Sequence, residues 1–279
     1  MKTKYIAIII GLLIFFQSCD KIDNPIKDNV LVWNNRKIVI YDFTGHKCGN
    51  CPEAHTTIKN LINIYGEAIV PIGIHCTYFA VPNDSSSNEY TYDFRTDIGD
   101  YLGGRNDGMG FYGEIYLPCG LVNNLSVENI SVKETWATQA AKYISTYPEF
   151  LIELQSEVEA DKISCTVNTV TNIENNRKLS LVAFLLEDKI TQWQTDYSAE
   201  TRDIENYEHN HVLRAGFNGA FGEEIKSDNN ISTIGSEIKK SYTLDLSTKW
   251  DIANCSVVTF VYDTDTKEIL QAEVVHFNE

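Results

Sequence analysis

The chain has 279 residues and carries 39 acidic against 23 basic side chains, which gives a formal net charge of −16. Binding to nucleic-acid phosphates needs a basic face, so this balance argues against nucleic acid as a partner. Anionic membrane surfaces also repel an acidic protein, so attachment to a membrane would need an anchor other than surface charge.

The amino terminus has the pattern of an exported protein. A basic start is followed by an apolar run from Tyr5 to Phe16 and then by Gln17-Ser18-Cys19. This pattern predicts a signal peptide over residues 1–18, because the run is too short for a spanning helix. A cysteine directly after the apolar core and a small residue resembles a bacterial lipobox, which implies cleavage before Cys19 and attachment of lipid to its sulfur. The alternative is an ordinary secretory signal with an incidental cysteine.

Cleavage would leave 279 − 18 = 261 residues, a length that suits two domains better than one. Residues 19–35 are polar and lack a sustained apolar period, so they predict a tether. The hydrophobic pattern then changes near residue 149. We therefore expect one domain over residues 36–148 and a second over residues 149–279.

The most informative stretch joins a predicted strand to a cysteine pair and then to a predicted helix. Residues 36–43 and 69–75 have the apolar pattern of strands, and residues 52–65 have helical spacing, so together they predict a parallel crossover unit. Cys48 stands where the first helical turn has unpaired N–H groups and the positive end of the dipole, both of which favour a thiolate. Cys48 is the candidate nucleophile, and Cys51 is its natural resolving partner.

Two other uses of this pair compete with redox chemistry. One is a permanent structural disulfide, and the other is half of a zinc site. A zinc site would usually need a second cysteine pair or suitably spaced histidines, and the sequence contains no second CxxC. We therefore predict no metal and no cofactor for this pair. The sequence does not decide between a redox-active pair and a structural disulfide.

The same segment resembles a known active site. Asp42 begins an Asp-Phe pair that is separated by four residues from Cys-x-x-Cys, which resembles the active-site segment of thioredoxins. The resemblance implies that Asp42 is a buried base beneath Cys51 and helps to deprotonate it, with Cys48 as nucleophile. The segment differs from thioredoxin at Lys47, which replaces a tryptophan and should favour the thiolate, and at Asn50, which replaces a proline.

A second stretch with a thioredoxin counterpart runs from Ile115 to Val122. Thioredoxin-like proteins carry a cis-proline at the start of the strand that faces the cysteine pair, and Pro118 has that place in chain order. The resemblance implies a cis Leu117–Pro118 bond that exposes the Leu117 backbone to a bound peptide, and cis bonds are almost confined to X–Pro. Cys119 would then be either a third exchanging thiol or a small buried residue.

From residue 150 on, short β-type runs follow one another. They cover residues 151–158, 162–170, 179–186, 190–195, 242–246, 255–262 and 268–277. This spacing is typical of a β-sandwich, most like an immunoglobulin or fibronectin type III module. Cys165 and Cys255 fall on separate predicted strands, where a disulfide between them would link the two sheets.

Histidines raise two further interpretations. His209 and His211 would lie on one side of an extended segment, as metal ligands must, but no third ligand is identifiable. The alternative is a hydrogen-bonded loop that packs on the first domain. We expect His55, on the first turns of the predicted helix, to be solvated or to cap the helix.

One longer pattern points to a family. The string from Phe43 to Pro52, taken with His209-Asn-His-Val-Leu-Arg214, is similar to the outer-membrane-protein-twenty-eight-related lipoproteins. This resemblance covers most of the mature chain. It implies a lipid-anchored protein of the outer membrane that faces either the periplasm or the cell surface, and it informs architecture more than activity.

The sequence thus predicts an α/β thioredoxin-like domain followed by an all-β immunoglobulin- or fibronectin-like sandwich. The first functional hypothesis is a lipid-anchored thiol–disulfide oxidoreductase of the cell envelope, whose partners are protein thiols or disulfides and which contacts the membrane through its lipid alone. The alternative is a non-catalytic binding or adhesion lipoprotein with a thioredoxin-like scaffold and a permanent Cys48–Cys51 disulfide. A third, weaker hypothesis is metal carriage through His209, His211 and the thiols.

Overall fold

Two parallel strands in the first half of the chain are buried along their whole length. Strand β1 (Ile38–Thr44) pairs in parallel with β2 (Ile69–His75) over all seven residues of each. Burial on both faces explains why both strands are near-continuous apolar runs. Helix α2 (Cys51–Tyr65) connects them, so the predicted strand, helix and strand are confirmed.

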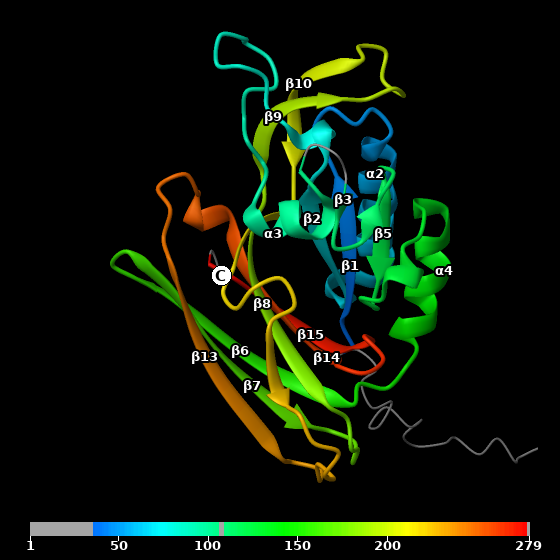
Figure 1. The fold of residues 1–279 in the computed structure, drawn as a ribbon, viewed down its shortest axis with the longest axis vertical. Coiled ribbons are helices and arrows are strands. Elements are labelled where there is room, and N and C mark those ends of the chain that lie inside the picture. Colours follow the sequence, from blue (N-terminus) through cyan, green and yellow to red (C-terminus); the bar gives the residue numbers. More distant parts are fainter. Residues whose placement is uncertain (1–35, 106–108, 278–279) are drawn as a thin grey trace, which may run out of the picture. The chain divides into compact units, whose positions relative to one another are not determined.

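The computed structural model describes residues 36–105 and 109–277, which Figure 1 shows as coloured ribbon. All of these residues belong to one compact unit. The predicted signal peptide, Cys19 and the tether over residues 19–35 lie outside the described residues. None of the helices in the described ranges is both long and apolar enough to cross a bilayer.

The other helices are α3 (Asp97–Gly103) and α4 (Lys133–Ile144), with 3-10 turns η2 (Gly66–Ala68), η3 (Tyr78–Ala80), η4 (Val127–Asn129) and η5 (Ile252–Asn254). The other strands are β3 (Met109–Gly110), β4 (Gly113–Glu114), β5 (Cys119–Val122), β6 (Phe150–Glu159), β7 (Lys162–Thr171), β8 (Leu179–Glu187), β9 (Ile190–Thr195), β10 (Asp203–His209), β11 (Val212–Gly216), β12 (Glu223–Lys226), β13 (Glu237–Asp245), β14 (Cys255–Asp263) and β15 (Ile269–His276).

One mixed sheet runs through both halves of the chain. Its strand order is β15-β14-β8-β11-β2-β1-β5, and β12 also pairs with β8. Strand β11 pairs in parallel with β2, whereas β5 is antiparallel to β1. The early strands β1 and β2 and the late strands β14 and β15 therefore share a sheet, as their colours in Figure 1 show.

Strand β8 joins the two halves because both of its faces are covered. All nine of its residues are buried. Val182, Phe184 and Leu186 belong to the core that also contains residues of β1 and β2. Leu181 and Leu185 belong to a second core with residues of β6, β7 and β14. A strand with two buried faces has no polar side, which explains its continuous apolar sequence.

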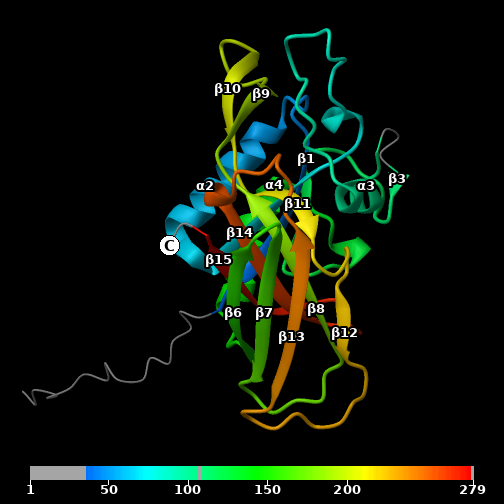
Figure 2. The ribbon, with the colours of Figure 1, turned by 90° about the vertical axis from the view of Figure 1, so that its left-hand side faces the viewer.

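A three-stranded sheet in the order β13-β7-β6 covers the second core. Figure 2 shows these three long strands side by side. The strands opposite them are β8, β14 and β15 of the central sheet, so the second layer is not a sheet of its own. The fold is a mixed α/β structure with one central mixed sheet and small antiparallel sheets, and it does not clearly contain a separate sandwich. The boundary between residues 148 and 149 stays a prediction.

Aromatic rings connect the two halves inside the first core. The Tyr41 ring centroid lies 6.4 Å from that of Phe184 and 6.2 Å from that of Phe260. Phe184 and Phe260 are themselves 6.1 Å apart. Because Tyr41 lies on β1 and Phe260 on β14, one packed cluster contains residues from both sides of the predicted boundary.

We expect Phe260→Ala to lower the free energy of unfolding by about 3–5 kcal/mol, because it leaves a cavity in a fully buried aromatic cluster. Unfolding in urea, followed by fluorescence and by circular dichroism, should still give one transition. The matched control is Val158→Ala on β6, where the side chain is 39% exposed and the change should stay within about 0.5 kcal/mol. Two transitions, only one of them shifted by Phe260→Ala, would show that the halves unfold independently.

Candidate functional site

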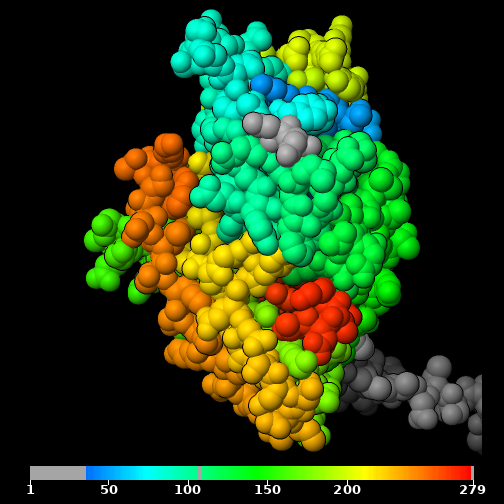
Figure 3. Space-filling view, in the orientation of Figure 1, coloured from blue at the N-terminus to red at the C-terminus, as the bar shows by residue number. Residues whose placement is uncertain are grey.

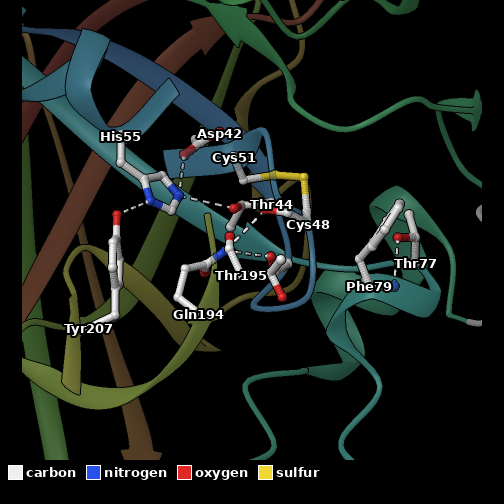
Figure 4. The surroundings of a disulfide bond; sticks show 11 residues. Asp42, Thr44, Cys48, Cys51, His55, Thr77, Phe79, Gln194, Thr195 and Tyr207 are labelled. Atoms are coloured by element: carbon white, nitrogen blue, oxygen red, sulfur yellow. Dashed lines mark hydrogen bonds and ion pairs between the residues drawn. A yellow bond between two sulfur atoms is a disulfide. The ribbon is translucent and has the colours of Figure 1, made fainter. Parts of the chain in front are cut away.

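The two cysteines of the CxxC motif are joined at the start of helix α2. Cys48 and Cys51 form a disulfide with their Cα atoms 5.5 Å apart, and Figure 4 shows it with its surroundings. Cys51 is the first residue of the helix, and Pro52 follows at a position where the N–H that proline lacks would be unpaired anyway. The Cys51 amide donates to the Cys48 carbonyl over 3.2 Å, which closes the turn.

Both cysteines are shielded from solvent. Cys48 is 2% exposed and Cys51 is 0% exposed. Thiol–disulfide exchange requires a thiolate to reach one sulfur of the disulfide. In the conformation that the structure describes, a client protein has no such access.

The first cover is the hairpin of β9 and β10, which the chain inserts between β8 and β11. Its backbone pairs with the loop that carries the cysteines. The Thr195 amide donates to the His46 carbonyl over 2.9 Å, and the Tyr197 amide donates to the Gly49 carbonyl over 2.8 Å. The hairpin is therefore attached to the CxxC loop by main-chain hydrogen bonds.

Side chains of the same hairpin complete this cover. The buried Gln194 amide group donates to the Cys48 carbonyl over 3.0 Å. The Tyr197 ring lies directly on Gly49, where an added Cβ atom would be 2.3 Å from the ring. Gly49 thus allows the hairpin to approach. This contact was not predicted from the sequence. The glycine between the two cysteines is the one sequence feature that could have indicated a close approach at this point.

The second cover is the turn at Phe79. The Lys47 amide donates to the Phe79 carbonyl over 3.1 Å, and a Cβ atom at Gly45 would lie 2.7 Å from Phe79 Cβ. The Lys47 ammonium, which we expected to favour a thiolate, instead donates to Asn83 over 2.7 Å. Near the top of the face in Figure 3, the segment after β2 (cyan) and the β9–β10 hairpin (yellow-green) lie on either side of the segment that joins β1 to α2 (blue).

Asp42 is buried on β1, at the position that the thioredoxin resemblance implied. It is 3% exposed, and burial raises the pKa of its carboxyl group to about 8. Its Oδ2 atom lies 3.5 Å from His55 Nε2, and its Oδ1 atom has no hydrogen-bond partner. The carboxyl group is therefore mostly protonated at neutral pH.

His55 does not have the solvated or capping position that we expected. Its Nε2 atom lies 3.0 Å from Thr44 Oγ1, and its Nδ1 atom lies 2.7 Å from the Tyr207 hydroxyl group. Burial lowers the pKa of His55 to about 4, so its ring is neutral at neutral pH. Figure 4 shows the imidazole between Tyr207 and the Asp42–Thr44 strand. Sequence reasoning missed this role because Tyr207 is 152 residues away.

The Leu117–Pro118 bond is cis, as the resemblance implied. It precedes β5, where Cys119 pairs with Phe43 and Gly120 pairs with Asp42. Leu117 is partly buried and packs against the first core. The role of Leu117 and Pro118 in binding a peptide stays a prediction.

The remaining described cysteines are free and buried. Cys119 and Cys76 contribute to the first core, and burial raises the pKa of both thiols, to about 12 for Cys119. Neutral buried thiols are poor nucleophiles. This favours the interpretation of Cys119 as a small buried residue over that of a third exchanging thiol.

The suggested Cys165–Cys255 disulfide is absent from the structure. Both residues are free thiols inside the second core, and burial raises the pKa of each to about 12. They pack among aliphatic side chains, where a cysteine behaves as a small apolar residue. The two layers are held together by apolar packing.

His209 and His211 lie in different surroundings. His209 is buried, with its ring 4.5 Å from that of Phe94, and His211 lies 3.2 Å from Asp188. Among the described residues no group of three or more His, Cys, Asp or Glu side chains is placed to hold a metal ion. His209 ends strand β10, and both of its ring nitrogens lack hydrogen-bond partners within the described ranges. The hydrogen-bonded loop of the alternative interpretation is therefore wrong for His209, although its ring does pack on the first half of the chain at Phe94.

Residues 110–279 match the family described as outer membrane protein Omp28. This match covers more than half of the chain. The chain belongs to the Omp28 family. The predicted family resemblance is thus confirmed, and the family is named for proteins of the outer membrane. The matched Omp28 region includes His209 and Arg214 but not the Cys48–Cys51 pair, so membership does not by itself assign redox chemistry.

Two solved structures are similar to this chain to different degrees. The chain is similar to HBP35 of Porphyromonas gingivalis, with a TM-score of 0.58, 17% identity, and coverage of 88% of this chain and 76% of that chain. It also matches a domain of the outer membrane lipoprotein Omp28 from Porphyromonas gingivalis at 26% identity, with a TM-score of 0.33, over 48% of this chain and 91% of that chain. The likeness to HBP35 shows the fold alone. No curated protein matches the chain.

We expect Asp42→Asn to stabilise the protein more strongly as the pH rises from about 4 to 8. The folded carboxyl group has a pKa of about 8 against an ordinary 3.8, so between these values the folded state holds a proton that the unfolded state releases. Rising pH therefore lowers the free energy of unfolding of the wild type but not of the variant.

The difference in free energy of unfolding should be near zero at pH 4 and reach a few kcal/mol at pH 8. Urea titrations of both proteins at each pH measure it, and contributions from the buried histidines cancel because both proteins contain them. A variant that is less stable than the wild type at pH 8 would contradict the assignment of Asp42 as a buried, unpaired acid.

Proposed function

We propose that the chain is a lipid-anchored envelope protein in which the thioredoxin-like half is a binding scaffold and the Cys48–Cys51 disulfide is a structural bond. The burial of both cysteines beneath the β9–β10 hairpin carries this proposal. Reactive cysteines are typically partly exposed, and disulfides that are easily reduced are typically strained or accessible. A disulfide that is covered from two sides fits a structural role.

Two features of the sequence support the anchoring part of the proposal. The lipobox-like pattern at Cys19 supports a lipid on that sulfur, and the polar residues 19–35 suit a tether between the membrane and the folded part. The Omp28 family is described as an outer membrane protein family, which supports a location at the outer membrane. With a net charge of −16, the protein would depend on the lipid for membrane attachment.

Residues 149–279 would supply the surface that meets a partner. We infer an immunoglobulin- or fibronectin-like sandwich here, supported by the two layers β13-β7-β6 and β15-β14-β8 over a shared core. Along β13 half-buried and exposed positions alternate, so its outer side chains face solvent. Disulfide exchange needs no such layer, whereas a binding protein would use it.

We expect the disulfide of the folded full chain to be reduced by dithiothreitol no faster than the chain unfolds globally. Alkylation at timed intervals, read by mass spectrometry, measures the reduction rate, and dilution into urea measures the unfolding rate. The matched variant with Ser at both Cys48 and Cys51 should fold, with a loss of about 2 kcal/mol in free energy of unfolding for so small a ring. Reduction that outruns unfolding would contradict a purely structural disulfide.

The second candidate is thiol–disulfide exchange that requires the hairpin to move. The buried, protonated Asp42 carboxyl group favours it. A client thiolate would attack Cys48 Sγ and break the disulfide, so that Cys51 leaves as a thiolate and takes a proton, which Asp42 can donate. A second client thiolate would then attack the mixed disulfide and release Cys48, which leaves the client oxidised and the pair reduced.

Gln194→Ala combined with Tyr197→Ala tests this candidate, because it removes two parts of the cover without altering either cysteine. Under gated exchange we expect oxidation of a dithiol peptide to become at least tenfold faster, and Cys51→Ser in the same background to accumulate mixed disulfides on a non-reducing gel. Glu205→Gln, an exposed change on β10, is the control. No acceleration and no adducts in the uncovered variant would remove the oxidoreductase hypothesis.

A further inference from the structure

A cavity of about 480 Å³ lies between helix α2, strand β2 and the end of β10. Asp42, Thr44 and His75 line it from the sheet, and Tyr207 lines it from β10. Neither cysteine of the disulfide is among its lining residues. Its volume is within the range of small-molecule pockets and far above that of one water molecule.

Strand β2 explains why the chain leaves this space open. On this face the strand presents Pro71 and Gly73, which have no bulky side chain to fill it. The Gly73 amide donates to the His211 carbonyl over 2.7 Å, and a Cβ atom at residue 73 would lie 3.2 Å from that oxygen. The turn between β10 and β11 can therefore approach β2 closely and close one side of the cavity.

Buried polar atoms without partners line this cavity. Asp42 Oδ1 and both ring nitrogens of His75 lack hydrogen-bond partners, although the two residues are only 3% and 4% exposed. Buried polar groups in folded proteins are nearly always paired, and exceptions call for an occupant or a role. Because both side chains line the same cavity, an occupant with hydrogen-bonding groups would satisfy them together.

The charges around the cavity favour a cationic occupant. Burial lowers the pKa values of His55 and His75, so both rings are neutral at neutral pH. Both nitrogens of His55 are bonded to Thr44 and Tyr207, whereas His75 offers an unpaired nitrogen as acceptor. Lys59 is exposed and shares the lining with the exposed Glu208, which offsets its charge. An anion would therefore meet no buried positive group among the described lining residues, whereas a cation would meet a carboxyl group that can ionise.

We infer that this cavity binds a small organic cation that carries an ammonium or guanidinium group seated against Asp42. The cation would donate to the Asp42 carboxylate and His75, and the Thr44 and Tyr207 hydroxyl groups offer further acceptors. The inference goes beyond the proposed function and does not rest on it. Neither cysteine lines the cavity, so a cation could bind there whether or not the disulfide exchanges.

Binding of this kind releases a proton. Asp42 is mostly protonated when the cavity is empty and would be ionised beside the cation, so affinity for a permanently charged ligand should rise with pH up to about 8 and then level off. The titratable groups that face Asp42 are His55 on α2, His75 on β2, Tyr207 on β10, and the thiols Cys76 and Cys119. His209, His211, Lys59 and Glu208 also line the cavity. Burial keeps the first five groups and His209 neutral between pH 6 and 8, so the Asp42 carboxyl group is the buried group whose charge changes in this range.

The test uses three probes of similar size on the full chain in a nonionic detergent: n-butylguanidinium, 1-butanol and butyrate. Titration followed by calorimetry and by the NMR signals of the histidine rings should show saturable binding of n-butylguanidinium only. Its affinity should fall roughly fiftyfold from pH 8 to pH 6, as a carboxyl pKa of about 8 requires.

Asp42→Asn should weaken binding of the cation at least tenfold, and Glu205→Gln, which removes an acidic charge from exposed β10, should leave it unchanged. If Asp42→Asn fails to fold, the pH profile of the wild type is still decisive. Equal binding of butanol or butyrate, a flat pH profile, retention of affinity in Asp42→Asn, or the absence of saturable binding, which would mean that the cavity holds water only, would each overturn the inference.

Discussion

The burial of β8 on both faces is the constraint on which the rest of the structure depends. Because neither face of β8 can meet solvent, the strand must lie inside a sheet that has a core on each side. That sheet is the same one that contains β1 and β2. The chain leaves β8 to form the β9–β10 hairpin and returns as β11, which pairs with both β8 and β2. The hairpin is thus fixed at both ends in the central sheet, near the ends of β1 and β2 that carry the site.

This one insertion explains three features of the site. Gln194 and Tyr197 cover the disulfide, Tyr207 bonds to the His55 ring, and the turn at His211 closes the cavity beside Asp42. Thiol–disulfide exchange needs a thiolate to reach one sulfur of the disulfide. Here the hairpin blocks access to both sulfur atoms in the conformation that the structure describes.

Local features of the fold were predictable from the sequence, because they depend on neighbouring residues. The apolar runs and the helical spacing around Cys48 predicted β1, α2 and β2. The cis bond at Pro118 was implied by the thioredoxin resemblance and not by local pattern. Features that depend on distant pairing were not predictable. Nothing near Gly49 indicates that Tyr197 lies on it, and nothing near His55 indicates Tyr207. The β runs after residue 150 predicted β6 to β9, β14 and β15, but they missed β10 to β12 and all but the end of β13. They could not tell that β8 and β11 would extend the first sheet.

The central claim is that the hairpin is a fixed part of the fold and holds the disulfide under cover. Native-state hydrogen exchange at the amides of Thr195 and Tyr197 tests it most directly, because these two groups bond to the CxxC loop. The account predicts that both amides are protected to nearly the same extent as those of β1, and that they exchange through global unfolding. Exchange as fast as that of the exposed residues 227–231 would show a hairpin that opens freely, and it would contradict the claim.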